Sequence, residues 1–446
     1  MSAERGRRWL AALGLHRPEL RAWALYDWGF AAMITTITTA VFPIYFVKVA
    51  AALTPGPAAT ARLAWVSSAA LAVAAAISPM LGALADQAPI KKRGLAACMV
   101  VGVAACAGMW WIERGDLTLA SWLFGIVLVA GTASFVFYEA LLPHLARPDE
   151  IDRVSTAGYA LGYFGGGILL ALNLAWILRP ALFGLPSGPG LTPSQATLPT
   201  RLAFVSVAVW WLSFSVVSLR GMPEPPITAP EASRREPVRS ALRQLAHTVR
   251  LLRRYPQAGL LLAAFLVYND GIQTIIKMAT AYGTEIGIGT SALIGSILLV
   301  QFVGVPCAFL FGSLAGRIGS KRAILFGLGV YAVIAVLGYF MRTGTDFLVL
   351  AILVGTVQGG TQALSRSLFA TLIPPARSGE FFGLFSVFEK VAGIFGPLFF
   401  AAAIWLTGSS RSAILSIILF FVVGAALLLR VDVATGQARA AAPANE

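Results

Sequence analysis

The stretch from Gly82 to Arg93 reads Gly-Ala-Leu-Ala-Asp-Gln-Ala-Pro-Ile-Lys-Lys-Arg, and a similar stretch begins 230 residues later. From Gly312 to Arg322 the chain reads Gly-Ser-Leu-Ala-Gly-Arg-Ile-Gly-Ser-Lys-Arg. Glycine lets two helices approach closely, and a carboxylate can accept from helix N-termini or pair with a nearby arginine. The alternative is charge that only sets topology, which explains the basic cluster but not the glycine and the aspartate. We therefore predict a latch, meaning a cluster that holds two halves of the protein together on one side and releases them when they move. It consists of Gly82, Asp86, Lys91, Lys92 and Arg93, with Gly312, Arg317, Lys321 and Arg322 in the second copy.

A second pair of matching stretches indicates an internal duplication. An early apolar run contains Tyr26-Asp-Trp-Gly, and a later one contains Tyr268-Asn-Asp-Gly. Duplicated halves around a site in the middle of the membrane are a recurring design of transporters. Two matches in the same order therefore predict two related halves.

The composition excludes a soluble protein. The chain has 446 residues, of which 58% are hydrophobic and 12% charged, with a mean hydropathy of +0.78. A soluble domain has about 25% charged residues, and a disordered chain combines low hydrophobicity with high charge. The net charge of +14 first suggests nucleic acid, but a nucleic-acid-binding protein would not carry this much apolar sequence. The class that remains is an integral membrane protein with many spans and no nucleic-acid partner.

The chain carries no motif for catalysis or for a cofactor. Cys98, Cys106 and Cys307 lie in apolar runs, without a CxxC or Cys/His cluster, and are expected to pack as small hydrophobic side chains. No Walker loop, nucleotide fingerprint or zinc motif is found in the sequence. We therefore expect no enzyme, no cofactor and no metal.

Twelve apolar runs reach the length of about 20 residues that a membrane span needs. An all-α protein is expected, because barrel strands would alternate polar and apolar residues. The predicted spans are 22–48, 62–85, 94–112, 118–142, 154–178, 201–219, 257–282, 290–316, 323–341, 347–373, 381–406 and 411–429.

The basic residues predict the orientation of these spans. With the N-terminus in the cytosol, the cytosolic segments hold 24 of the 34 lysines and arginines, the opposite side seven and the spans three. Positive charge gathers on the cytosolic side, so both termini are predicted to be cytosolic. The predicted parts are an N-terminal segment (1–21), a six-helix bundle (22–220), a basic cytosolic linker (221–256), a second six-helix bundle (257–430) and a cytosolic tail (431–446).

The repeated loop resembles the signature of the major facilitator superfamily, although Ala88-Pro-Ile replaces its usual more polar turn. Longer stretches resemble the bacterial "unknown major facilitator" family, which is related to the fungal vacuolar amino-acid effluxers of autophagy. The resemblance covers about residues 20–430 and implies two pseudo-symmetric six-helix bundles, with helices 1, 4, 7 and 10 lining a central cavity. The stretches are Trp23-Ala-Leu-Tyr-Asp-Trp, Gly158-Tyr-Ala-Leu-Gly-Tyr-Phe-Gly-Gly-Gly, Tyr268-Asn-Asp-Gly-Ile-Gln-Thr and Gly359-Gly-Thr-Gln-Ala-Leu-Ser-Arg-Ser.

Charged residues inside spans are costly and mark candidate sites. On the seventh span, Asp270, Gln273 and Lys277 occupy i, i+3 and i+7 of one helical face, directly after Tyr268 and Asn269. The lysine would meet the carboxylate of a zwitterion and the aspartate its ammonium, or the aspartate would bind a coupling proton. An Asp–Lys contact that only braces helices is the alternative. The seven charged residues within spans are Asp27, Glu139, Asp270, Lys277, Arg366, Glu389 and Lys390.

The tenth span repeats the pattern, with Gln358, Gln362 and Arg366 at i, i+4 and i+8. Arg366 is predicted either to clamp a substrate carboxylate with two parallel bonds or to form a gating ion pair with Glu389, which lies at a similar depth. The two interpretations are equally supported.

Asp27 and Glu139 lie near the cytosolic ends of their spans. Asp27 is interpreted as a proton carrier, or else as a cytosolic-side helix cap or latch residue, and Glu139 as a partner of Arg153. Gly158, Gly162 and Gly166 form overlapping Gly-x-x-x-Gly steps, which allow tight helix packing. In related transporters a glycine-rich fifth helix acts as a pivot, so these glycines are interpreted either as a pivot or as serving packing alone.

These patterns predict a secondary solute transporter that works by alternating access and is coupled to protons. The solute is expected to be a small zwitterion or organic anion, with amino-acid efflux favoured by the resemblance. The alternatives are a lipid or drug exporter, or a sensor or scaffold on the transporter fold. A monomer in the lipid bilayer of a bacterial inner membrane is expected.

Overall fold

The computed structural model describes residues 15–87, 90–147, 151–224, 249–374 and 378–441, together with positions 10, 243, 246 and 247. Side chains are described throughout, except at 79, 83–87, 151–153, 156, 305, 308–309, 378–380 and 390. Each of the twelve predicted spans falls on helical segments. Ten helices in these ranges are long and apolar enough to cross a membrane. The predicted spans 290–316 and 381–406 are not among those ten, so twelve spans remain a prediction.

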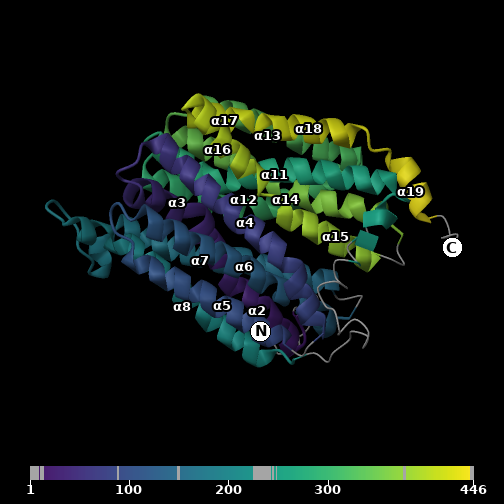
Figure 1. Ribbon diagram of the computed structural model, residues 1–446, viewed down its shortest axis with the longest axis horizontal. Coiled ribbons are helices and arrows are strands. Elements are labelled where there is room, and N and C mark those ends of the chain that lie inside the picture. The colour runs from purple at the N-terminus through teal and green to yellow at the C-terminus, as the bar shows by residue number, and fades with distance from the viewer. Residues whose placement is uncertain are drawn as a thin grey trace. The chain divides into compact units, whose positions relative to one another are not determined.

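The chain divides into two compact units. The first comprises Met1–Leu53 and Ala76–Ala241, and the second Thr54–Ala75 and Leu242–Glu446. In the first unit α2 lies against α7 and α8, and α5 lies against α6 (Figure 1). Its elements are α2 (Pro18–Ala32), η1 (Met33–Ala40), α3 (Phe42–Tyr45), η2 (Phe46–Ala50), α5 (Lys91–Gly108), η3 (Met109–Trp111), α6 (Leu117–Leu145), α7 (Ile151–Leu178), η4 (Pro180–Phe183) and α8 (Pro193–Gly221).

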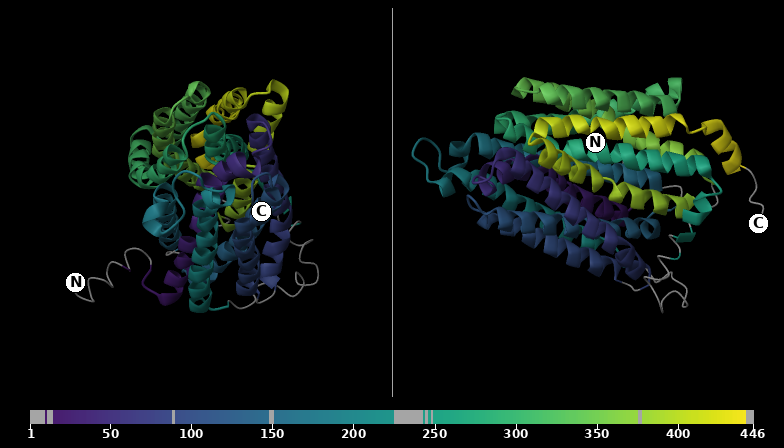
Figure 2. Two further views of the ribbon diagram at one scale, coloured as in Figure 1. Left: turned by 90° about the vertical axis from the view of Figure 1, so that its left-hand side faces the viewer. Right: turned by 45° about the horizontal axis from the view of Figure 1, so that its top comes forward.

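In the second unit α11 packs on α18, and α14 packs on both α12 and α13. The short α19 follows α18 at the C-terminal end of this unit (Figure 2). Its elements are α11 (Pro256–Glu285), α12 (Thr290–Ile318), α13 (Ser320–Phe340), α14 (Gly344–Thr371), α15 (Ser378–Val391), α16 (Phe395–Thr407), α17 (Ser410–Ser416), α18 (Ile418–Leu429) and α19 (Val433–Ala441).

Helix α4 (Gly56–Gln87) contributes to both units. Its first part, up to Ala75, belongs to the second unit, whereas the predicted bundle 22–220 assigned the whole helix to the first. The contacts of Glu285 on α11 explain the difference. Thr60 donates to the Glu285 carboxylate, and the Glu285 side chain lies against Gly56.

The first predicted span is not a uniform α-helix. After α2 it contains two π-helical segments, η1 and η2, separated by the single turn of α3. The sequence of η1 is Met-Ile-Thr-Thr-Ile-Thr-Thr-Ala, and its four threonines are buried. Threonine hydroxyls compete for main-chain carbonyls and disturb regular helical turns, and Thr35 Oγ1 donates to the carbonyl of Ala31 at 3.1 Å. Wide turns of this kind are frequent at functional sites.

The predicted span 381–406 is wrong as a single helix. It is interrupted at residues 392–394, between α15 and α16, where Gly393 has a left-handed φ of +95°. Glycine adopts this conformation without a steric penalty. The interruption lies beside polar residues of α11.

An aromatic cluster packs α2 against α6 in the first unit. The rings of Trp23 and Tyr138 stack with centroids 4.4 Å apart, and the Trp23 indole donates to the carbonyl of Tyr138 at 3.1 Å. Tyr26 donates to Ser134 at 2.8 Å. Lipid tails are as apolar as the side chains, so packing and hydrogen bonds of this kind hold membrane helices together.

Candidate functional site

Two neighbouring residues of α11 form polar contacts with α14. The hydroxyls of Tyr268 and Ser365 are 2.5 Å apart, and Gln362 Nε2 donates to Asn269 Oδ1 at 3.2 Å. Tyr268, Asn269 and Ser365 are all buried. The Asn269 Nδ2 group is buried and has no hydrogen-bond partner among the described residues. These contacts hold the polar face of α11 against α14.

Asp270 caps the interruption between α15 and α16. Its Oδ1 accepts hydrogen bonds from the backbone amides of Gly393 at 2.6 Å and Gly396 at 2.9 Å. The first amides of a helix have no intrahelical partner, and a carboxylate at that end is stabilising. Asp270 therefore supplies from α11 the N-terminal cap that α16 lacks in its own sequence. Its Oδ2 is buried and has no partner in the described part of the chain.

The two glycines at the interruption face α11 at very short range. A Cβ on Gly396 would collide with the Thr274 hydroxyl, which itself donates to the carbonyl of Asp270 at 2.7 Å. A Cβ on Gly393 would lie 2.5 Å from Lys277 Nζ and 3.3 Å from Gln273 Cβ. The structure thus brings Asp270, Gln273 and Lys277 together at the break. The predicted site on the seventh span has a second wall, which the sequence did not indicate.

The polar row on α14 is only partly engaged. Gln362 binds Asn269, whereas Gln358 is half-buried. Arg366 is exposed, and its guanidinium lies 5.5 Å from the ring centroid of Phe382. No ion pair joins Arg366 to Glu389 within the described ranges, so the predicted gating pair is not formed in this structure. The aromatic face attracts the guanidinium in place of the carboxylate.

Asp27 lies against the glycine-rich face of α7. It is 6% exposed, and a Cβ on Gly162 would lie 3.2–3.3 Å from its carboxyl group. No donor reaches this carboxylate among the residues that the structure describes. Glu139 lies close enough to interact with it electrostatically. The predicted pairing of Glu139 with Arg153 falls outside the described side chains.

The predicted glycines of α7 do lie along the contact with α2. A Cβ on Gly158 would lie 2.8 Å from the Trp23 ring, and a Cβ on Gly166 would lie 3.0 Å from the carbonyl of Ala31. The tightest approach occurs at Gly165, opposite the Trp28 carbonyl, which sequence reasoning had not selected. Their role as a pivot remains a prediction.

The first copy of the latch differs from its prediction. A Cβ on Gly82 would meet only Val136, at 4.0 Å, so among the described residues nothing there requires glycine. The side chain of Asp86 falls outside the described part. Lys91 and Lys92 begin helix α5, where Arg93 is exposed, and the carboxylate of Glu224 accepts from the Lys92 amide at 3.1 Å. This acid offsets the basic first turn of the helix.

In the second copy of the latch, the structure shows a lysine that caps the end of a helix and, among the residues it describes, no close helix contact at the glycine. Lys321 Nζ donates to the carbonyls of Leu429 at 2.9 Å and Val431 at 2.7 Å, at the end of α18. Arg317 and Arg322 are exposed. Nothing described lies within 4 Å of a Cβ on Gly312.

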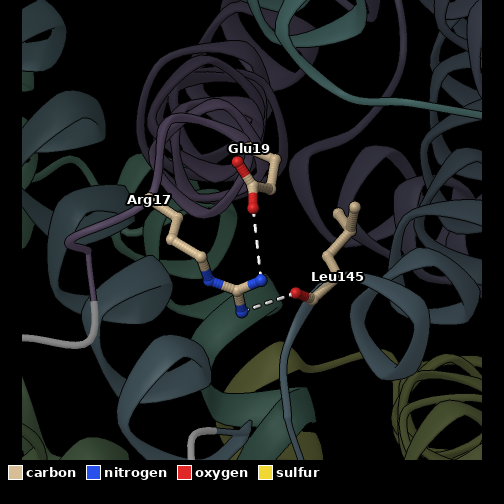
Figure 3. A network of polar contacts seen from close by, with 3 residues as sticks. All are labelled: Arg17, Glu19 and Leu145. Atoms are coloured by element: carbon tan, nitrogen blue, oxygen red, sulfur yellow. Dashed lines mark hydrogen bonds and ion pairs between the residues drawn. The ribbon is translucent and has the colours of Figure 1, made fainter.

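Arg17 has the same kind of role in the first unit. Its guanidinium donates to Glu19 at 3.2 Å and to the carbonyl of Leu145, the last residue of α6, at 2.8 Å (Figure 3). Cations near the last carbonyls of a helix are stabilising. Basic residues that set the topology therefore also cap helices.

Two polar clusters were missed in the sequence. Glu285 Oε2 accepts from Thr60 at 2.5 Å and from Ser410 at 2.6 Å. In the first unit, Asn173 donates to Thr36 at 3.4 Å and accepts from Ser206 at 2.9 Å. The run of threonines in the first span was the available signal for the second cluster.

Comparison with known proteins places the chain among transporters. The model of a family described as vacuole effluxer Atg22 like matches residues 16–441. The uncharacterized MFS-type transporter YxiO of Bacillus subtilis is 34% identical over 411 residues, which are 91% of this chain and 93% of YxiO. Autophagy-related protein 22-2 of Emericella nidulans is 29% identical over 62% of this chain. That match covers 49% of the fungal protein, so the chain spans about half the length of this relative.

Two solved structures have the same fold. A D-xylose–proton symporter superimposes with a TM-score of 0.68 at 15% identity, over 92% of this chain and 96% of its own. A bacterial homologue of the human lysosomal transporter Spinster, in an inward-facing and unoccupied conformation, gives 0.67 at 15% identity, over 96% and 98%. The fold and the relatives define a multi-pass membrane transporter of the major facilitator type. The chain belongs to the Atg22-like vacuole effluxer family.

Proposed function

We propose that the protein is a proton-coupled secondary transporter that exports a small zwitterionic or anionic solute by alternating access. Amino acids are the first class of solute to test. The helix break beside Lys277 is the observation that carries the proposal. Transporters build their solute sites at interrupted helices, where main-chain polar groups are left free of the helical hydrogen-bond pattern.

The second unit would bind the solute. Lys277 and Gln273 flank Gly393, and an ammonium with an adjacent amide suits a carboxylate. The Asp270 Oδ1 oxygen is occupied by two amides, which leaves the buried Oδ2 as the acceptor for a substrate ammonium. Arg366 remains a candidate clamp for a carboxylate, because no described carboxylate holds it.

The first unit would carry the proton. Asp270 is fixed by two donors, whereas the buried carboxyl group of Asp27 has none in the described ranges. A buried carboxyl group without donors can take up and release a proton without breaking a network. We assign coupling to Asp27, with Glu139 as its acidic neighbour.

The remaining elements of the proposal concern the membrane. We propose twelve spans with both termini in the cytosol, a monomer in a bacterial inner membrane, and no enzymatic activity. The excess of lysine and arginine in the predicted cytosolic segments supports the orientation.

A thermal-shift screen of the purified protein against amino acids, peptides, sugars and organic acids tests the solute. Binding stabilises the native state, so a solute raises the unfolding midpoint by an amount that grows with the logarithm of its concentration relative to its dissociation constant. Lys277→Met should abolish the shift, whereas Lys92→Met, in the other unit, should keep it. An equal shift in both variants would contradict the assignment of Lys277.

Transport in proteoliposomes tests the proton. Asp27→Asn should retain solute exchange across the membrane but lose accumulation driven by a pH gradient. Accumulation at the wild-type rate in this variant would reject Asp27 as the carrier.

A lipid or drug exporter is the second candidate, and one observation favours it. A pocket of about 490 Å³ lies between α7 and α8, lined by apolar residues that include Leu169, Trp176, Trp210 and Phe214. Efflux of a hydrophobic dye that is reduced by Leu169→Trp, with amino-acid exchange unchanged, would support this candidate.

A further inference from the structure

A polar pocket lies in the first unit, and none of the residues assigned to transport lines it. It has a volume of about 280 Å³, and its lining includes three basic side chains, Lys48, Arg114 and Arg201, against one carboxylate, Glu113. A main-chain hydrogen bond joins the two segments that carry Lys48 and Arg114, because the Gly115 amide donates to the carbonyl of Val49 at 3.0 Å. The pocket therefore has an excess of positive charge.

The clustering of three basic side chains in this pocket is unusual, given how the basic residues are distributed along the chain. The orientation expected from the sequence places only seven lysines and arginines on the non-cytosolic side. Three of those seven line this one pocket. The positive-inside rule explains a scarcity of basic residues on that side but not their convergence. The seven are Lys48, Arg62, Arg114, Arg179, Arg201, Arg342 and Arg411.

Arg201 is the buried basic residue in the lining of the pocket. It is 7% exposed, and its Nη2 donates to the carbonyl of Ser194 at 2.8 Å and to the hydroxyl of the same residue at 2.6 Å. Nη1 donates to the carbonyl of Trp110 at 3.3 Å, and the guanidinium lies 5.1 Å from the centroid of that ring. Its Nε has no partner among the described residues. A buried guanidinium without a carboxylate partner leaves its charge uncompensated, which is costly unless an anion approaches.

The start of α8 adds a second source of positive potential. Thr192 and Gln195 form a capping box, Pro193 is the first helical residue, and Ser194 and Ala196 line the pocket. The first turn contains no acidic residue. The capping box and Pro193 already occupy or remove most of the first-turn amides, so this 29-residue helix contributes mainly the positive end of its dipole to an approaching anion. The segment between α7 and α8, which leads into Pro193, extends past the ends of both helices (Figure 1).

We propose that this pocket binds a phosphate group. Arginine binds phosphate through its parallel N–H groups, lysine acts as a point charge, and the positive end of the α8 dipole favours an anion. The phosphate can belong to an anionic lipid headgroup or to a free phosphate ion, and the experiment separates these sources. The site is independent of the proposed solute site at Lys277.

The first measurement titrates inorganic phosphate into the full chain in neutral detergent, at constant ionic strength set with chloride. Bound phosphate should raise the thermal unfolding midpoint. Arg114 is exposed, so Arg114→Ala should preserve the fold while weakening the apparent affinity at least fivefold. Glu113→Gln removes the opposing charge and should strengthen it. Arg179→Ala, an exposed arginine of the same unit outside the pocket, is the matched control and should leave the affinity unchanged.

The second measurement uses nanodiscs of phosphatidylcholine with and without phosphatidylglycerol, and identifies retained lipid by native mass spectrometry. Loss of retained phosphatidylglycerol in Arg114→Ala, without a response to free phosphate, identifies a lipid headgroup. A response to free phosphate that is lost in the same variant, without retained phosphatidylglycerol, identifies a free ion. The proposal fails if neither form binds, or if Arg114→Ala and Arg179→Ala behave alike.

Discussion

The carboxylate of Asp270 accepts a hydrogen bond of 2.6 Å from the backbone amide of Gly393, across 123 residues of sequence. The same oxygen accepts from Gly396, so one aspartate of α11 holds the turn between α15 and α16. A charged side chain in a membrane helix thereby serves the backbone of another helix. This contact makes the interruption a fixed part of the second unit.

Removing the Asp270 carboxylate should destabilise the second unit. Hydrogen bonds to a charged group contribute roughly 1.5–3 kcal/mol each, and Asp270→Ala leaves two buried amides without an acceptor. We expect a clear drop in the thermal unfolding midpoint for Asp270→Ala and a smaller drop for Asp270→Asn, which keeps one carbonyl oxygen. Equal midpoints for the two variants and the wild type would contradict the capping role.

Adding a methyl group at Gly393 should cost more than the backbone conformation alone. The left-handed conformation costs a non-glycine residue about 1–2 kcal/mol. Gly408 also has a positive φ, +68°, but nothing lies within 4 Å of a Cβ there. Gly408→Ala therefore measures the conformational cost, and Gly393→Ala should exceed it and also weaken solute binding through Lys277. The comparison needs only two melting curves and one titration, and identical losses would show that the contact with Lys277 is unimportant.

The glycines of α7 should respond in two different ways. A Cβ on Gly165 would meet the Trp28 carbonyl, which cannot move without shifting α2, so Gly165→Ala should lower stability strongly. The three atoms nearest to a Cβ on Gly162 all belong to the Asp27 carboxyl group, at 3.2–3.3 Å. Gly162→Ala should keep the fold and alter the pH dependence of transport. A pH profile that matches that of the wild type would contradict a role for Asp27 in proton coupling.

The hydroxyls on Glu285 should anchor the beginning of α4. Thr60→Val and Ser410→Ala each remove one hydrogen bond to the same oxygen, each worth roughly 1.5–3 kcal/mol if the acceptor is charged. We expect faster hydrogen–deuterium exchange at residues 56–75 in Thr60→Val and in Glu285→Ala, and a smaller change in Ser410→Ala. Because the two donors share an acceptor, their double variant should deviate from additivity. Additive effects would mean that the donors act independently.

Hydropathy and residue type were enough to predict where the helical spans lie, but not where a span is interrupted. The apolar runs placed every predicted span on helical segments, and the charges at Asp270 and Lys277 pointed to the candidate site because such charges are rare in spans. The break at Gly393 was invisible, because glycine is common in membrane helices and its capping residue lies 123 positions earlier. Glu285 was missed because it follows the predicted span, where a carboxylate needs no explanation. Gly82 was over-interpreted, because a motif shows which residue is present and not how near its neighbours lie.

The dependence of Gly393 and Gly396 on Asp270 has a consequence for how the sequence can change over generations. A side chain at either glycine displaces the aspartate or the α11 residues around it, and loss of the aspartate leaves the glycines with unpaired amides. Drift at any one of the three positions is therefore tolerated only with compensation at another. Asp270, Gly393 and Gly396 should be inherited together as one unit across lineages, although they lie in spans that no local motif connects.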